Sequence, residues 1–270
     1  MLEPINLDAR NVGLLGDAVE TLWKKHSTDI LDRENTARLR WKAITEGLEP
    51  DWLWNAFLES LATNGGARHW EHLKFIRREF IGCGAADPLC WHQVLEYDHG
   101  KLDNWLSVAA NPHFQRWKGI KRNLRDFVEA HRGDRLRSAQ EELVRSDRES
   151  SISIMSALPG IKDKYARNLL MGVGHLHFMD NSLALDSRIE GFLKRVTGLG
   201  HTYRSRSAVA WTEGELVRVA HRVGITAWQM DRLLFEHGNS HPLPGRSRHP
   251  GRPPISSRPA APKHRRPKRT

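Results

Sequence analysis

The chain has 270 residues, of which 39% are hydrophobic, so it can bury the core of one domain or of two closely packed ones. It has no run of 18 apolar residues, and its N-terminus lacks the basic start and apolar stretch of a signal peptide. Two cysteines, Cys83 and Cys90, are typical of a reducing compartment; their spacing matches no zinc pattern, and two thiolates cannot hold a four-iron cluster. We therefore expect a cytoplasmic protein, of the bacterial cytosol or nucleoid, with no membrane association and no metal ligands.

The formal net charge of +10 resides almost entirely at the C-terminal end. Residues 239–270 contain nine Lys or Arg, no acidic residue and eight of the thirteen prolines. Residues 1–238 carry 33 basic and 32 acidic side chains and are nearly neutral. A Pro/Arg-rich segment cannot bury enough apolar surface to fold, so we predict a folded domain at 1–238 and a disordered basic tail at 239–270. The tail either binds polyanions through counterion release or is only a solubilising terminus.

The folded part is predicted to be all-α, because it contains no convincing run of alternating apolar and polar residues rich in Val, Ile and Thr. Pro50 begins one helix, and Gly174 and Gly198 follow apolar helical stretches as left-handed helix stops do. The expected helices span residues 8–26, 32–47, 50–63, 66–81, 88–96, 101–109, 112–131, 135–148, 149–157, 163–173, 187–197, 211–223 and 225–237.

A tight turn, Leu158-Pro159-Gly160-Ile161, separates two of these helices. Proline fixes one backbone angle, and glycine permits a conformation that other residues avoid. Backbone N–H groups at such a turn and at the start of the next helix point outward together, and they form an anion site suited to a DNA phosphate. Taken alone, the same string is also typical of an ordinary helix–helix connection.

Lys164 lies in the first turn of the following helix, within reach of a ligand held by the turn. A neutral lysine that attacks an aldehyde-level sugar carbon forms an imine, and the nearby cations Lys162, Arg167 or Arg188 would favour the neutral amine. The alternative reading is a solvated surface lysine.

Asp186 opens the next predicted helix, and N-capping alone would explain its presence. A carboxylate at this place also suits glycosidic cleavage, because departure of the base builds positive charge on the sugar, which a nearby anion stabilises. On this hypothesis the carboxylate of Asp186 stabilises the cation and the amine of Lys164 captures it.

The segment from Leu158 to Ala166 and the segment Ala184-Leu185-Asp186 resemble the helix-hairpin-helix–Gly/Pro/Asp superfamily of DNA glycosylases. The hairpin of that superfamily reads Leu-Pro-Gly-Val-Gly-x-Lys-x-Ala and is followed by Val-Asp-x-His-Val or a similar sequence. Lys164 matches the Schiff-base lysine of bifunctional members, the endonuclease III and 8-oxoguanine DNA glycosylase types. Asp186 matches the aspartate that gives the superfamily its name.

This resemblance implies two α-helical lobes with a DNA-facing cleft between them, a helix-hairpin-helix motif at about 149–174 and a catalytic aspartate loop at 182–187. It implies a monomeric enzyme of base-excision repair that needs no cofactor and acts on damaged double-stranded DNA. The base would leave as Lys164 forms a Schiff base, and β-elimination would nick the strand. An oxidised purine is the first expected substrate; an oxidised pyrimidine is the second, because the iron–sulfur cysteines of the endonuclease III type are missing.

The sequence departs from the superfamily pattern in three ways. Lys162 replaces the second hairpin glycine, so an ammonium group alters or supplements the phosphate contact otherwise expected of Leu158, Gly160 and Ile161. Asp186 follows Lys164 by 22 residues, a few more than usual. The residues after Asp186 read Ser-Arg-Ile in place of a Thr-His-Val type of sequence.

The resemblance also implies residues that contact the flipped nucleotide. Asn64 and Arg68 lie in a segment similar to the loop with which 8-oxoguanine glycosylases fill the vacated stack; Asn64 would be the wedge, and Arg68 would read the widowed base. A plain Asn-Gly-Gly turn is the alternative. Asn168, one helical turn after Lys164, and Trp228, on the last helix, would form the base pocket, although Trp228 also suits a core position.

Other functions stay open at this stage. A helix-hairpin-helix protein that binds DNA without catalysis is favoured by Lys162 and Asn168. A monofunctional glycosylase would use Asp186 and an activated water. A helical protein-interaction module is a third alternative.

Overall fold

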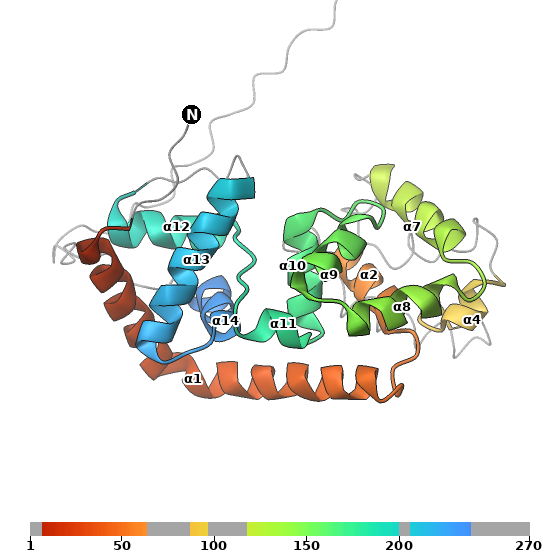
Figure 1. Ribbon diagram of the computed structural model, residues 1–270, viewed down its shortest axis with the longest axis horizontal. Coiled ribbons are helices and arrows are strands. Elements are labelled where there is room, and N and C mark those ends of the chain that lie inside the picture. Colours follow the sequence, from red (N-terminus) through yellow and green to blue (C-terminus); the bar gives the residue numbers. More distant parts are fainter. Residues whose placement is uncertain (1–6, 64–86, 97–117, 200–205, 239–270) are drawn as a thin grey trace, which may run out of the picture.

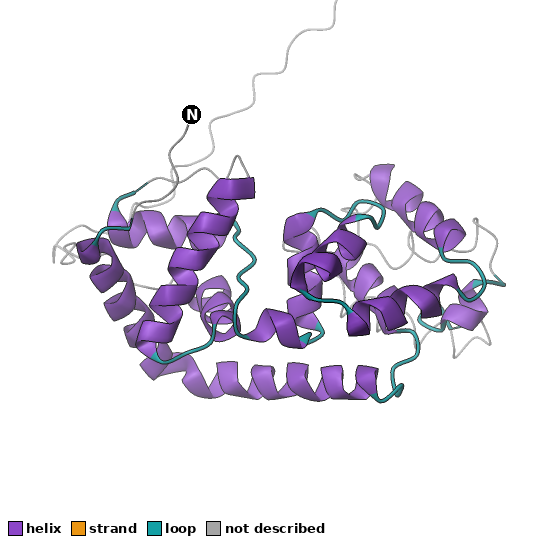
Figure 2. Cartoon of the chain, in the orientation of Figure 1, coloured by secondary structure: helices purple, strands orange, loops and turns teal. Residues whose placement is uncertain are grey.

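The computed structural model describes residues 7–63, 87–96, 118–199 and 206–238, and within these ranges every regular element is a helix (Figures 1 and 2). The all-α prediction is therefore confirmed. The helices are α1 (Ala9–Thr45), α2 (Trp52–Thr63), α4 (Trp91–Val94), α7 (Lys118–Ala130), α8 (Arg135–Arg145), α9 (Arg148–Ser156), α10 (Asp163–Gly172), α11 (Leu176–Met179), α12 (Ser187–Thr197), α13 (Arg206–Val223) and α14 (Ala227–His237).

Several helix boundaries differ from those expected. The break expected between 26 and 32 is wrong: α1 continues through it, because Ile30 and Glu34 lie on its buried face and tertiary packing overrides a weak local preference. The short helix α11 was expected to be loop, and His175 caps it by accepting a hydrogen bond from the His177 N–H. The expected helices at 66–81 and 101–109, the first residues of the one at 112–131, and the tail at 239–270 lie outside the described residues.

The helices form two lobes, as Figure 1 shows. One lobe contains α12, α13, α14 and the first part of α1; the other contains α2, α4 and α7 to α10. The long helix α1 runs beneath both lobes and packs on α12, α13 and α14, while α11 contacts α10 on one side and α14 on the other. The chain therefore crosses between the lobes along α1 and again through α11.

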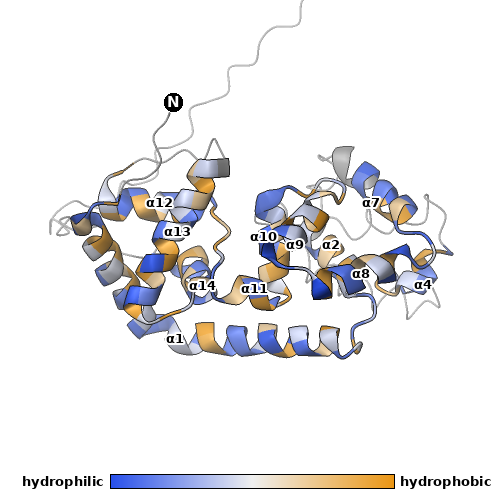
Figure 3. Cartoon of the chain, in the orientation of Figure 1, coloured by the Kyte–Doolittle hydropathy of each residue, from blue (hydrophilic) through white to orange (hydrophobic). Residues whose placement is uncertain are grey.

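Each lobe has an apolar interior. Along α1 and the other helices, hydrophobic and hydrophilic residues recur turn by turn, as is typical of amphipathic helices (Figure 3). In the lobe with α2, the fully buried rings of Phe57 and Phe127 stack with their centroids 4.2 Å apart, and Trp54 and Trp91 pack beside them. No helix in the described ranges is long and apolar enough to cross a membrane.

Gly174 ends the α10 segment and allows it to approach α1. Its φ of 76° is in the left-handed region, and the N–H of His175 donates to the Leu170 carbonyl at 2.9 Å, as the sequence predicted for a helix stop. A Cβ at this position would lie 2.1 Å from the Ala37 carbonyl oxygen of α1. Only glycine fits here, and this contact fixes α10 against the helix that joins the lobes.

Candidate active site

The hairpin between α9 and α10 forms as the sequence indicates. The N–H of Ile161 donates to the Leu158 carbonyl at 3.0 Å and closes the turn. Gly160 has a φ of 75° and is exposed, whereas the side chains of Leu158 and Ile161 are buried in the core. At these two positions only the backbone can contact a ligand at the turn. The exposed Lys162 is the N-cap of α10, and the first N–H groups of that helix follow it.

We expect Gly160→Ala to destabilise the hairpin. The backbone at the alanine would have to keep the left-handed conformation, which costs about 1–3 kcal/mol for a residue other than glycine, and the added Cβ would lie 2.0 Å from the Nδ2 atom of Asn123 on α7. The free energy of unfolding in denaturant measures the loss. Gly214→Ala on α13 is the control: no atom lies within 4 Å of the added Cβ, so we expect a gain of roughly 0.5–1 kcal/mol. Equal effects of the two variants would contradict this account of the turn.

The first turn of α10 presents Lys164. The opposite side of α10 is apolar, and Ala166, Leu169 and Leu170 are buried there. Lys164 therefore lies on the polar side of the helix and is exposed. The Lys164 Nζ lies 5.7 Å from the centre of the Tyr165 ring.

Asp186 is presented by an extended segment, residues 182–186, that leads into α12. Its Oδ1 accepts hydrogen bonds from the N–H groups of Arg188, at 2.8 Å, and Ile189, at 3.0 Å. The N-capping role foreseen from the sequence is thus real. Because the cap uses Oδ1 alone, it does not require Oδ2, and capping does not compete with a chemical role for that oxygen.

Lys164 and Asp186 line the same cavity, which has a volume of about 620 Å³. This volume lies in the range of roughly 300–1,000 Å³ typical of ligand pockets. Both lobes contribute: α2 and α10 on one side, and α12 and α14 on the other. The lining residues are Arg40, Ala56, Glu59, Ser60, Lys164, Tyr165, Asn168, Leu169, Gly172, Val173, Asp186, Ser187, Arg188, Arg232 and Phe235.

The cavity wall on the α12 and α14 side combines an aromatic ring with guanidinium groups. The Arg188 guanidinium carbon lies 3.8 Å from the centre of the Phe235 ring, and an Arg188 N–H donates to the Phe235 carbonyl at 3.4 Å. Arg232, from the same helix as Phe235, also lines the cavity. This wall offers a flat surface and positive charge together.

A buried polar network holds the segment before Asp186. The N–H of Leu183 donates to Glu213 Oε1 at 3.0 Å, and the N–H of Ala184 donates to Asp231 Oδ1 at 2.8 Å. Burial, together with the charges of Asp186 and Glu213, raises the pKa of Asp231 to about 6, against the opposing effects of Arg232 and of the Ala184 N–H. The carboxyl group of Asp231 therefore changes from neutral to negatively charged at about pH 6, close to neutral pH.

The raised pKa of Asp231 predicts how its replacement by asparagine acts. The folded state binds the proton of the Asp231 carboxyl more tightly than the unfolded state does. Protonation of Asp231 therefore stabilises the folded state below about pH 4, and this stabilisation is lost as the pH rises through 6. The stability of Asp231→Asn relative to the parent should therefore increase between pH 4 and pH 7, by roughly 2 kcal/mol for a shift of this size.

Denaturant unfolding at several pH values measures this difference, and Asp147→Asn is the control. Hydrogen bonds from Ser150 lower the pKa of Asp147 below its usual value of 3.8, so its replacement should lose stability relative to the parent as the pH rises toward 4 and should change little between pH 4 and pH 7. If both variants change in the same direction with pH, the assignment for Asp231 is wrong.

The structure brings some of the predicted residues together and not others. Asn168 lines the cavity, whereas Trp228 does not: it is 3% exposed, and its indole N–H donates to the Met171 carbonyl at 2.9 Å. The core reading of Trp228 is therefore the correct one; Phe235, about two turns further along the same face of α14, lines the cavity instead. Asn64 and Arg68 lie outside the described residues.

Sequence reasoning missed Phe235, Arg232 and Glu213. Phe235 and Arg232 differ by three positions and so share a face of α14, but the sequence contains no signal that this face meets a cavity rather than the core. Glu213 is a buried acid in an otherwise ordinary amphipathic helix, and nothing local distinguishes it from a solvated one.

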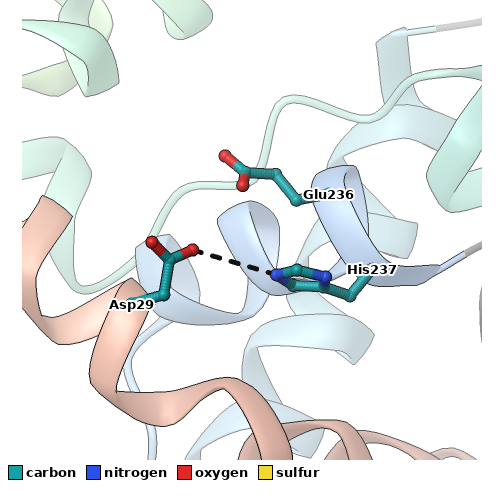
Figure 4. Close-up of side chains that lie close together, drawn as sticks. All are labelled: Asp29, Glu236 and His237. Atoms are coloured by element: carbon teal, nitrogen blue, oxygen red, sulfur yellow. Dashed lines mark ion pairs between the residues drawn. The ribbon is translucent and has the colours of Figure 1, made fainter.

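One group of residues among the described ranges has the spacing of metal ligands, and it lies outside the cavity. Asp29 of α1 faces Glu236 and His237 at the end of α14, with His237 Nε2 3.9 Å from Asp29 Oδ2 (Figure 4). The guanidinium of Arg33 contacts both carboxylates. A cation of the protein itself already pairs with both carboxylates, so the group serves to attach the end of α14 to α1.

The solved structures that are similar to this one include two 8-oxoguanine DNA glycosylases. The match to the 8-oxoguanine DNA glycosylase of Thermotoga maritima has a TM-score of 0.58 and 14% sequence identity, and covers 86% of this chain and 99% of that one. The match to the 8-oxoguanine DNA glycosylase of Methanocaldococcus jannaschii has a TM-score of 0.59 and 13% identity, and covers 85% and 95%. No protein-family model and no curated protein matches the sequence. With its hairpin, its two lobes and these matches, the chain has the helical fold of the 8-oxoguanine DNA glycosylases.

Proposed function

We propose that this protein is a bifunctional DNA glycosylase and AP lyase of base-excision repair. One observation carries the proposal: Lys164 and Asp186, from different lobes, line one cavity large enough for a nucleotide. A surface lysine and a residue that only caps a helix would have no reason to line the same cavity. An amine and a carboxylate beside a common ligand are the two groups that glycosidic cleavage through an imine requires.

The chemistry follows from these two groups. A damaged nucleotide turns out of the duplex into the cavity. The nitrogen of Lys164 forms a bond to the sugar C1′, the bond from C1′ to the base breaks, and the base leaves with the electron pair. Asp186 stabilises the positive charge that develops on the sugar and helps transfer the lysine proton. Ring opening gives an imine; loss of a proton from C2′ then expels the 3′ phosphate, which nicks the strand.

In this proposal the hairpin binds the DNA backbone. The exposed turn at Gly160 and the N-terminal N–H groups of α10 form an anion site, and the positive end of the helix favours a phosphate there. Lys162 adds an ammonium group at the same end. A phosphate held at this point lies at the start of the helix whose first turn carries Lys164. We therefore propose that a monomer binds double-stranded DNA, next to the lesion, through this hairpin.

The base would lie against the wall formed by Arg188 and Phe235, opposite Asn168. A guanidinium stacked on an aromatic ring offers a flat face on which any base can stack. The Asn168 amide and the charged groups of Glu59 and Arg40 supply donors and acceptors for the edge of the base. An oxidised purine is the proposed substrate, since the two solved structures named above are 8-oxoguanine DNA glycosylases; an oxidised pyrimidine is the second candidate.

A panel of duplex oligonucleotides, each with a single lesion, tests the proposal when base loss and strand nicking are scored separately. We expect base loss and nicking together on a duplex with an oxidised purine, and nicking of a duplex with an abasic site. Base loss without nicking would support a monofunctional enzyme. Binding of every duplex with neither reaction would support a DNA-binding protein that lacks catalysis.

A further inference from the structure

The segment that ends in Asp186 is held by side chains rather than by a sheet or a helix. Ser182, Leu183 and Ala184 are buried, so their backbone N–H groups need partners inside the protein. Two of these partners are carboxylates: Glu213 of α13 accepts from Leu183, and Asp231 of α14 accepts from Ala184. The position of Asp186 therefore depends on the helices behind it.

Glu213 also reaches across to the other lobe. Its Oε1 lies 2.8 Å from a nitrogen of Arg148, at the start of α9, and its Oε2 lies 2.7 Å from a nitrogen of Arg167 on α10. Arg167 follows Lys164 by three residues, about one helical turn. A single carboxylate thus contacts the segment that presents Asp186 and the helix that presents Lys164. Arg148 strengthens the link, since its Nε donates to the Ser182 hydroxyl at 2.9 Å.

The hydrogen bond from the Leu183 N–H does not require Glu213 to be charged. A glutamine of the same shape would accept that hydrogen bond equally well, without the cost of taking a carboxylate out of water. Glu213 is only 4% exposed, so this cost is substantial, and the two guanidinium groups offset it. A buried ion pair of this kind is weak evidence for stability, but it joins three elements in one arrangement.

We propose that Glu213 is a positioning residue that sets the distance between the Lys164 amine and the Asp186 carboxylate across the cavity. This inference rests on the proposed function, since the distance matters only if both groups act on one nucleotide. Glu213 does not line the cavity that holds both Lys164 and Asp186. With Arg167 it lines a second cavity, which Lys164 also borders, so its effect on the first cavity passes through its contacts with Arg167 and Leu183.

Glu213→Gln tests the inference, because it keeps the shape and the acceptor for Leu183 but removes the charge that holds Arg167. We expect the single-turnover rate of nicking at an abasic site to fall about 10- to 100-fold, while the dissociation constant for the same DNA stays within a factor of about two. Glu215→Gln is the matched control: Glu215 is also buried on α13, but its partner is Arg218 on the same helix. We expect the control to keep the parental rate.

Arg167→Gln provides a second route to the same answer if Glu213→Gln does not fold, as judged by circular dichroism and thermal unfolding. It removes the contact to Oε2 from the other side and should give a similar loss of rate. In the double variant the two losses should not add, because both break one link.

The outcomes separate the inference from the proposed function. Parental rates in folded Glu213→Gln and Arg167→Gln, with an active parent, would overturn the positioning role and leave the glycosylase proposal intact. Additive losses in the double variant would overturn it in the same way. A parent protein that never nicks abasic DNA would overturn the proposed function, and the positioning role with it.

Discussion

Lys164→Ala is expected to abolish both the covalent adduct that borohydride traps on abasic DNA and the nicking of that DNA. Among the described residues that line the cavity, the amine of Lys164 is the only group that can form an imine with the sugar, so its loss removes the proposed nucleophile and not merely an orienting contact. Removal of a catalytic nucleophile costs on the order of 10³- to 10⁶-fold in rate. Denaturing electrophoresis of the trapped adduct and of the nicked strand measures the two effects separately.

Lys162→Ala is the matched control for this experiment, since it removes the neighbouring amine from the same exposed hairpin. We expect adduct formation to persist in this variant once the DNA is saturated. DNA affinity should fall, and the dependence of affinity on salt should decrease by about one ion. If Lys164→Ala still releases the base without nicking, Asp186 and water perform the cleavage. An adduct that survives in Lys164→Ala would place the nucleophile elsewhere.

Asp186→Asn is expected to slow base release by roughly 10²- to 10³-fold, with little loss of stability. The amide oxygen can still accept the N–H groups of Arg188 and Ile189, so the cap survives. The negative charge that would stabilise the sugar cation is gone, and one electrostatic contact to a transition state is worth about that factor. Single-turnover base release from a lesion duplex is the measurement. Nicking of a preformed abasic site should fall less, because the base has already left.

Asp147→Asn is a close control for this substitution. Asp147 caps α9 in the same way, with its Oδ1 2.8 Å from the Ser150 N, and it does not line the cavity. We expect the rate of base release to remain that of the parent. If the two variants lose the same activity, the effect comes from weakened helix caps, and Asp186 has only a structural role.

The local parts of the site could be predicted from the sequence. The turn at Gly160, the helix stop at Gly174 and the cap at Asp186 all depend on groups within a few residues of one another, and backbone geometry limits which residue types can occupy them. For the same reason Lys164 could be placed in the first turn of α10. Hydrophobic spacing also indicated an all-helical chain, though not that α1 would continue past residue 26.

Contacts between residues far apart in sequence were decided only by the tertiary structure. The periodicity of α14 shows that Trp228 and Phe235 both belong to an apolar helix, but it cannot show that one is buried against Met171 while the other faces the cavity. Glu213 lies 30 residues beyond Leu183 and 46 beyond Arg167, and it meets both because three helices pack around one segment. The sequence by itself therefore determined the turn, the caps and the positions of the two candidate catalytic groups, since short-range sterics and hydrogen bonds specify them. Packing of whole helices decided which side chains surround those groups, because the burial of a side chain depends on every neighbouring element at once.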